Sequence, residues 1–368
     1  MRRIGILTTH RANNFGALLQ AYSLVNACQE LGAQAEIIDW RCPFYDWQYH
    51  KSIRITRNPI AVMRHYFWHI FKETRARQLF DAFRDRLPLS RPIRSRKELL
   101  EIGMAYDKFV VGSDQVWNPQ NSALRPEDFD RAFILDFVKE KSKNAYAASI
   151  GVDTIEPESV RAEFVNAWKH FDVITMREHE GAKYVSGLLG IHVDTVLDPV
   201  LLHDRHWWER MVVLRSSDAA PHVFEYNVRR VDGLDSFTRK IAAAEGAKVV
   251  NPIIPSFSFR RGKSFDSLGP AEFVSEIAQA RSVVTSSFHA AAFSVIFGKR
   301  LYLIRRKKSC DPNSRFLSLL KFAKLDEKVV EESERYCVAE IDCDNADQVA
   351  LSAERSASLN VLRQICLG

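Results

Sequence analysis

Short apolar runs rich in β-branched residues alternate with helical segments along both halves of the chain. The first run, 4–7, leads through a polar turn at 13–16 into apolar residues at helical spacing that end near Gly32, and 35–40 follows as the next run. This order is typical of a β-turn-α-β unit, the opening of a doubly wound sheet. It recurs downstream, with further predicted strands at 109–112, 145–150, 173–176, 223–226, 248–250, 282–285 and 301–304.

The number of such units predicts two domains. A chain of 368 residues is too long for one ordinary core. The polar stretch that begins at Asp198-Pro199 and ends at Pro221 interrupts the alternation. We therefore expect an α/β protein with two Rossmann-like, parallel-sheet domains that face each other across a cleft, one at 1–200 and one at 201–368, the last helix packing back on the first. In such sheets, ligands bind beyond the carboxyl ends of the strands.

Composition excludes several classes of protein. The chain has no run of about 18 apolar residues that could span a membrane, and the N-terminal apolar run is too short for a signal peptide. Its six cysteines show no spacing typical of a metal site, so that we expect free cytosolic thiols and no bound metal. The net charge is +6. Residues 51–100 alone carry 13 Lys and Arg against 4 Asp and Glu, and the rest is slightly acidic, which argues against nucleic-acid binding.

The basic segment lies within an insertion, about 43–105, that interrupts the α/β pattern of the first domain. Residues 59–71 mix apolar, aromatic and basic side chains. Such a segment could lie on the inner face of the membrane. The alternative is a basic helical insertion that packs on the first domain.

The sequence Ser286-Ser287-Phe288-His289 follows the predicted strand 282–285 and opens a helix of small residues. Ser286 or Ser287 can cap that helix, and the free N–H groups of its first turn favour an anion. An imidazole there can donate a proton or bind an anion. The alternative is a core histidine behind a tight turn.

Arg177 directly follows the predicted strand 173–176. An arginine at the carboxyl end of a strand can hold a carboxylate or phosphate through two parallel hydrogen bonds. Alternatively, it is a surface arginine paired with Glu178 or Glu180. Asn313 and Arg315 offer a weaker anion site from the second domain, or a helix cap and a surface arginine.

Two loops of the first domain suit a sugar. Asn13, Asn14 and Gly16 form the first, which lacks the GxGxxG fingerprint of dinucleotide binding, and its amides could bind hydroxyls or merely shape a turn. The second loop, 112–118, carries candidate acceptor ligands. A sugar ring could stack on an indole there while a carboxylate accepts a hydroxyl proton, although a capped helix with a packed tryptophan explains it too. The residues concerned are Asp114, Gln115 and Trp117.

Five motifs in order resemble the polysaccharide pyruvyl transferase family. The resemblance extends from about residue 4 to about residue 320, and no motif is decisive alone. The motifs are Asn14-Phe15-Gly16-Ala17-Leu18-Leu19-Gln20, Gly112-Ser113-Asp114-Gln115-Val116-Trp117-Asn118, Met176-Arg177-Glu178, Asp198-Pro199 and Ser286-Ser287-Phe288-His289-Ala290.

The resemblance implies a fold similar to the two-domain GT-B glycosyltransferases, with the acceptor on the N-terminal side and phosphoenolpyruvate on the C-terminal side. It implies transfer of pyruvate as a ketal to a sugar of a cell-surface polysaccharide or its lipid-linked precursor, without a cofactor. By the same resemblance, His289 is the proposed acid and, with Arg177, holds phosphoenolpyruvate. We expect Asp114 as the base, and Ser286, Ser287, Phe288, Asn313 and Arg315 at the donor.

The chain departs from some branches of that family. Ser287 stands where those branches carry arginine, Phe288 where leucine is common, and Ala17 where others carry aspartate. These changes bear on phosphate binding and on the acceptor. Two other functions remain open: a nucleotide-sugar glycosyltransferase of GT-B type and a non-catalytic sugar-binding protein.

Overall fold

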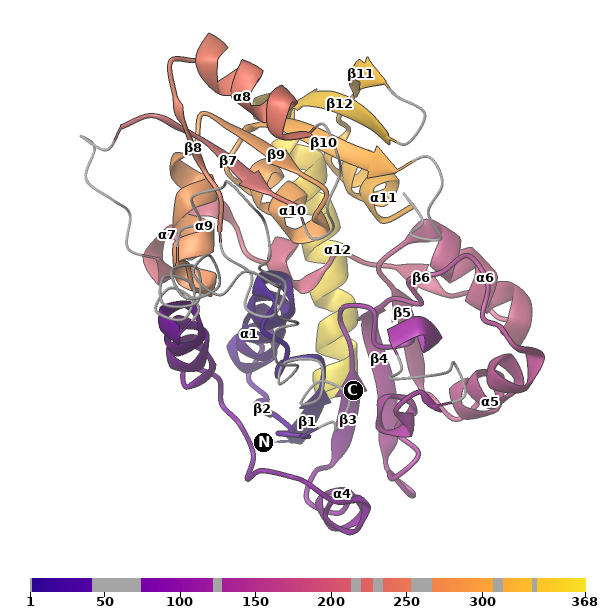
Figure 1. Cartoon of the computed structure of the whole chain (residues 1–368). Helices are drawn as coiled ribbons and strands as arrows, with labels where there is room; N and C mark the ends of the chain where they lie inside the picture. The colour runs from indigo at the N-terminus through magenta and orange to yellow at the C-terminus, as the bar shows by residue number, and fades with distance from the viewer. Residues whose placement is uncertain are drawn as a thin grey trace, which may run out of the picture.

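The computed structural model contains two six-stranded sheets, each covered by helices (Figure 1). The first sheet is built from residues 3–195 and the second from residues 222–342. The structure describes residues 2–41, 74–121, 128–212, 220–227, 234–252, 267–306, 314–332 and 336–368.

The first sheet is parallel throughout and has the order β2-β1-β3-β4-β5-β6. Its strands are β1 (Arg3–Leu7), β2 (Gln34–Ile37), β3 (Lys108–Val111), β4 (Ser142–Ala148), β5 (Val173–Met176) and β6 (Asp194–Thr195). Its helices are α1 (Phe15–Glu30), residues 74–84, α4 (Arg96–Ile102), α5 (Glu158–Trp168) and α6 (His179–Leu189). Because the strands run in one direction, the loops that follow β1, β3, β4 and β5 meet at one edge of the sheet.

The second sheet has the order β11-β12-β10-β9-β7-β8. Its strands are β7 (His222–Tyr226), β8 (Lys248–Val250), β9 (Ser282–Thr285), β10 (Arg300–Arg306), β11 (Lys328–Glu332) and β12 (Tyr336–Asp342), with helices α7 (Arg205–Met211), α8 (Leu234–Ala244), α9 (Pro270–Gln279), α10 (Phe288–Ile296) and α11 (Ser314–Ala323). β12 pairs antiparallel with β10 and β11. The second sheet is therefore mostly parallel, as expected for an α/β domain, and these two late strands add an antiparallel edge.

The predicted strands 173–176, 248–250 and 282–285 agree residue for residue with β5, β8 and β9. The last strand of the first sheet, β6, has only two residues and begins at Asp194. Periodicity finds buried strands well because their apolar runs are continuous. It does not find the mostly exposed β11.

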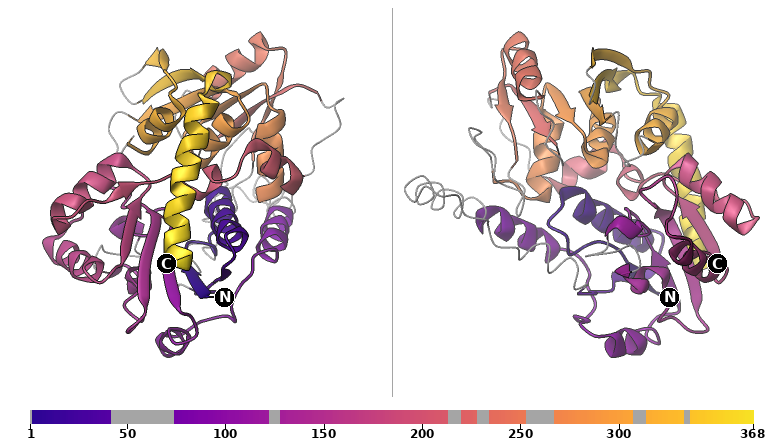
Figure 2. Two further views of the ribbon diagram at one scale, coloured as in Figure 1. Left: turned by 180° about the vertical axis from the view of Figure 1, so that it is seen from behind. Right: turned by 45° about the vertical axis from the view of Figure 1, so that its right-hand side comes forward.

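The C-terminal helix α12 (Gln348–Leu367) runs from the second sheet back along the first, as the view from behind shows (Figure 2). The backbone N–H of Leu197 donates to Ser358 Oγ at 3.0 Å, and Lys108 Nζ donates to the carbonyl of Ile365 at 3.0 Å. Arg355 Nε also donates to the carbonyl of Leu201. This helix therefore joins the two halves of the chain.

The start of α1 lies at the apolar contact between the two sheets' helices. The Phe15 ring stacks on Phe273 of α9 with ring centroids 4.5 Å apart, and packs edge-on against Tyr226 of β7. All three side chains are buried in one apolar cluster with residues of α10. Because burial of an aromatic side chain is among the larger favourable terms in folding, this contact fixes α1 against the second domain.

The segment 59–71, with its two alternative interpretations, lies outside the described residues. The helix at 74–84 contributes Phe80, which packs on Phe15 at 4.9 Å between ring centroids. Within the described ranges, no helix combines the length and the apolar character that crossing a membrane requires.

Candidate functional site

His289 lies in the first turn of α10, directly after β9 and the N-cap position of Ser287. Its ring packs against Gly16 at the start of α1. A Cβ atom added to Gly16 would lie 2.0 Å from His289 Nδ1. Only glycine leaves room for the imidazole at this position, so that the ring is held between the two domains.

The carboxylate of Asp198 joins the ends of several elements. Its Oδ2 accepts hydrogen bonds from Ser113 Oγ at 3.1 Å and from Arg177 Nη1 at 3.0 Å, and its Oδ1 accepts from the N–H of Val200. His289 Nε2 lies 3.7 Å from the same Oδ2. Asp198 is only 1% exposed. Burial alone would raise its pKa, but His289 and Arg177 lower it below the usual value.

Arg177 is enclosed by carboxylates and is 2% exposed. Its Nε donates to Glu178 Oε1 at 3.0 Å, and its Nη1 lies 3.8 Å from Asp114 Oδ1 in addition to the bond to Asp198. The Phe288 ring covers the guanidinium at 4.5 Å from the ring centroid. Burial opposes the charge, but Glu178 and Asp198 together raise the pKa of Arg177 above its usual value. Its Nη2 is buried and has no hydrogen-bond partner among the described residues.

Asp114 follows β3 in a left-handed backbone conformation, with φ of 70°. Its Oδ2 accepts a hydrogen bond from Thr9 Oγ1 at 3.1 Å. The side chain is 25% exposed, in contrast to Asp198. Asp114 is therefore a carboxylate beside the buried Arg177 that a ligand can still reach.

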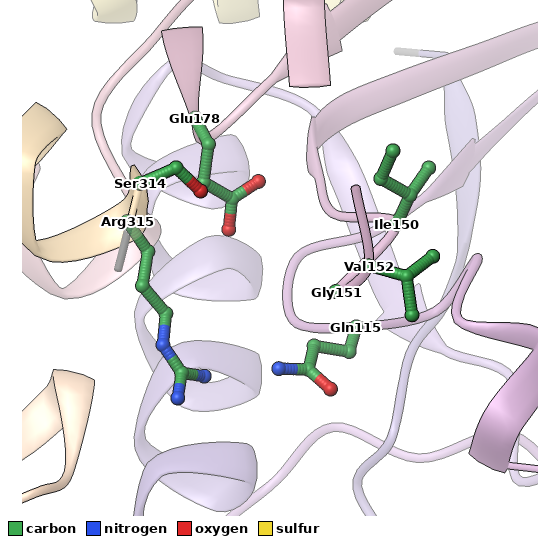
Figure 3. A pocket seen from close by; sticks show the side chains of 7 residues that line it. All are labelled: Gln115, Ile150, Gly151, Val152, Glu178, Ser314 and Arg315. Atoms are coloured by element: carbon green, nitrogen blue, oxygen red, sulfur yellow. The ribbon is translucent and has the colours of Figure 1, made fainter. Parts of the chain in front are cut away.

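A pocket of about 230 Å³, counted with its open mouth, adjoins this cluster between the two domains. Gln115, Gly151 and Glu178 line it from the first domain, and Ser314 and Arg315 line it from α11. The side chains of Arg315 and Gln115 point toward each other across it (Figure 3). Glu178 forms part of its wall and also binds Arg177, so that the pocket continues the cluster around Asp198.

A family model described as polysaccharide pyruvyl transferase matches residues 14–308, most of the chain and all of these residues except Thr9 and those of α11. The chain belongs to the polysaccharide pyruvyl transferase family. It is therefore a transferase of polysaccharide biosynthesis. No curated protein shows a match in sequence.

Solved structures confirm the fold. A Listeria monocytogenes protein described as a candidate UDP-N-acetylglucosamine 2-epimerase has a TM-score of 0.52 at 12% identity, over 98% of this chain and 90% of that one. A UDP-GlcNAc 2-epimerase from Methanocaldococcus jannaschii, in complex with UDP-GlcNAc and UDP, has a TM-score of 0.49 at 12% identity, over 98% and 99% of the two chains. The likeness to the Listeria protein confirms the predicted GT-B-like architecture.

The structure brings together most of the residues that the sequence analysis selected. His289, Phe288, Arg177, Asp114 and Gly16 meet at the cluster around Asp198. Gln115 and Arg315 lie in the adjoining pocket. Ser287 occupies the N-cap position of α10, but its hydroxyl accepts no hydrogen bond from the helix, and Ser286 is only partly buried. Asn313 lies outside the described residues.

Trp117 is placed differently. The expected stacking on an acceptor sugar is wrong, because the indole is fully buried. Its Nε1 donates to the carbonyl of Phe133 at 2.9 Å, and its ring packs on Trp168. An indole in a polar loop needs an apolar place for its ring, and here the core supplies it.

Asn13 and Asn14 use their side-chain oxygens within the protein. Asn13 Oδ1 accepts from Arg84 Nη2 at 2.9 Å, and Asn14 Oδ1 accepts from the N–H of Ala17 as the cap of α1. These contacts agree with the interpretation that the two side chains shape a turn, and they do not test whether the loop also binds a ligand. Their part in acceptor binding stays a prediction.

Sequence reasoning did not assign a role to Asp198, Glu178 or Thr9. Asp198-Pro199 looked like a domain junction, and Glu178 looked like a surface partner of Arg177. One sequence signal could have pointed to Asp198: this carboxylate lies between the apolar residues 196–197 and Pro199, at the end of the first predicted domain. Only the fold shows that Asp198 faces three other polar side chains.

The packing of His289 on Gly16 yields a first test. We expect Gly16→Ala to lower the free energy of unfolding by about 1–3 kcal/mol, because the imidazole must move away from the new methyl group. In the double variant Gly16→Ala/His289→Ala, the clash disappears and most of that loss should be recovered, as measured by urea denaturation. Gly187→Ala is the matched control, since nothing lies near its added methyl group. Additive losses in the double variant would contradict this packing.

The buried carboxylate of Asp198 yields a second test. Asp198→Asn should cost about 3–5 kcal/mol at neutral pH, because it breaks a buried ion pair. Since the pKa of Asp198 is lowered in the folded state, its contribution is present above the ordinary pKa of aspartate and is lost as the pH falls below about 4. The difference in unfolding free energy between wild type and variant should therefore shrink toward acid pH. A difference in unfolding free energy that stays constant well below about pH 4 would show that the charge of Asp198 does not stabilise the folded state.

Proposed function

We propose that this protein transfers pyruvate from phosphoenolpyruvate to two hydroxyl groups of one sugar and forms a ketal. The observation that supports this best is the position of His289, held between the domains with Nε2 3.7 Å from the buried Asp198 carboxylate. An imidazole in this position can donate a proton to a ligand bound between the domains. The family membership supports a pyruvyl donor.

The donor would be held mainly by the second domain. Nε and Nη1 of Arg177 already donate hydrogen bonds to the carboxylates of Glu178 and Asp198. Its Nη2 has no hydrogen-bond partner among the described residues and is the candidate ligand for an anion. The backbone N–H groups of Phe288 and His289, at the start of α10, favour phosphate or carboxylate oxygens. Arg315 reaches the pocket from α11 and can supply a positive charge. Ser286 and Ser287 stay candidate donor ligands beside them.

The reaction requires two bonds to the central carbon of phosphoenolpyruvate. His289 gives a proton to the methylene carbon, which becomes a methyl group, and the first sugar hydroxyl attacks the central carbon after losing its proton to Asp114. The second hydroxyl of the same sugar then displaces phosphate, and its proton leaves with phosphate or solvent. The products are the ketal and inorganic phosphate. The residues need no cofactor for this chemistry.

The acceptor would approach from the first domain. Asp114 is the carboxylate that a ligand can reach, and Asn13, Asn14 and Gln115 lie on neighbouring loops of the same sheet edge. We infer that the acceptor is a sugar of a cell-surface polysaccharide, carried on a lipid at the inner face of the membrane. Phosphoenolpyruvate is available on that side, so that we place the protein in the cytoplasm.

The role of His289 is tested by its replacement. His289→Ala should reduce turnover about 100-fold or more, because the proton donor is lost. The assay follows inorganic phosphate and labelled pyruvate from labelled phosphoenolpyruvate, with candidate lipid-linked oligosaccharides as acceptors. The exposed His192, which pairs with Asp194 away from this cluster, gives the control variant His192→Ala. Phosphate release at the wild-type rate by His289→Ala would rule out the proposed acid.

The alternatives differ in the ligand that the native state binds. A ligand that binds only the folded protein raises its melting temperature, by an amount that grows with its concentration over Kd. We expect phosphoenolpyruvate to raise the melting temperature and UDP-sugars to leave it unchanged. The reverse result would favour a nucleotide-sugar glycosyltransferase, and no response to either would favour a non-catalytic sugar-binding protein.

A further inference from the structure

A second group of charged side chains lies after β1 and β2, at the same edge of the first sheet. Asp39 is buried and accepts hydrogen bonds from two arginines: Arg11 Nε donates to Oδ1 at 2.6 Å, and Arg41 donates to Oδ2 from Nε at 3.2 Å and from Nη2 at 3.1 Å. Arg11 Nη2 also pairs with Asp39. One carboxylate therefore orients two guanidinium groups. We call Arg11, Arg41 and Asp39, together with the neighbouring Arg84, the arginine cluster.

Arg84 joins this cluster from the helix at 74–84. Its Nε donates to the carbonyl of His10, its Nη2 donates to Asn13 Oδ1 at 2.9 Å, and its Nη1 pairs with Asp81. Burial lowers the pKa of Arg84, and the nearby charges of Arg11 and Arg41 lower it further. The three arginines thus lie close enough to repel one another.

The charges of the cluster do not cancel. Three arginines face the two carboxylates of Asp39 and Asp81, and burial lowers the pKa of His10, which favours its neutral form. Arg11 and Arg41 remain 15% and 29% exposed, so that a ligand can reach them. The hydrogen bonds to Asp39 come from Nε of Arg11 and from Nε and Nη2 of Arg41. An excess of positive charge with directed N–H groups is suited to an oxyanion.

The cluster borders the candidate base. Thr9, which donates to Asp114 Oδ2 at 3.1 Å, lies two residues before Arg11. On the other side, Asn13 accepts from Arg84 and precedes the α1 start that packs on His289. An anion held by the arginines would therefore lie on the acceptor side of Asp114.

We propose that the arginine cluster binds the phosphate or diphosphate group through which the acceptor sugar is joined to its carrier. This inference rests on the proposed function for the identity of the acceptor. A phosphate group offers more oxygens and more charge than a carboxylate, and it can face two guanidinium groups that come from the loops after two different strands. Binding there would place the sugar beside Asp114 and would select carrier-linked sugars over free ones.

Binding of inorganic pyrophosphate, measured by calorimetry at constant ionic strength, tests this inference without turnover. We expect wild type to bind it and Arg41→Gln to bind it about tenfold more weakly or worse, because a charge-assisted hydrogen bond is lost. Arg91→Gln is the matched control, an exposed arginine of the same domain that pairs with Glu101. His289→Ala should bind like wild type, which separates this site from the donor site.

Two results would overturn the inference: unchanged affinity in Arg41→Gln, or loss of pyrophosphate binding in His289→Ala. Glucuronate that binds more tightly than pyrophosphate would overturn the choice of phosphate. If Arg41→Gln is unstable, Arg41→Lys keeps the charge and loses the planar fork, and we expect a severalfold weaker affinity. Failure of the proposed function would appear separately, as absence of pyruvate transfer by a protein that still binds pyrophosphate.

Discussion

The buried carboxylate of Asp198 is the contact on which the candidate site depends. It holds Ser113 at the end of β3 and Arg177 at the end of β5, and it faces His289 of the second domain. A charge without solvent is stable only when partners surround it. Each partner therefore has to come to Asp198, and the loops that carry them are fixed with respect to one another. The same carboxylate that stabilises the domain contact also sets the electrostatic surroundings of the imidazole.

The second constraint is steric. His289 can reach Asp198 only because Gly16 lets the imidazole lie on the backbone at the start of α1. That start is itself fixed by the Phe15 ring, stacked on Phe273 of the second domain. The apolar contact, the glycine and the imidazole thus form one continuous interface. A shift of α1 would change both the domain contact and the candidate acid.

The sequence predicts the strands and helices better than it predicts which side chains from different elements come into contact. β5 and β9 follow from short, mostly apolar runs rich in β-branched residues, because a strand that is buried on both faces has few polar positions. His289 and Arg177 follow from their positions after such strands. The role of Asp198 does not, since no local pattern says which side chains a junction residue will face. Trp117 shows the opposite error, because a polar loop says nothing of the core beneath it.

The charge balance of the cluster bears on how an anionic donor could be held. Asp198, Glu178 and Asp114 surround the single guanidinium of Arg177, so that this arginine brings little net positive charge to a ligand. The remaining candidate anion ligands are the imidazole, the first amides of α10 and the α11 residue Arg315, all from the second domain. An anion that enters between the domains would therefore be drawn toward the second domain. The carboxylate of Asp114, on the first domain, would then remain available to receive a proton from the acceptor.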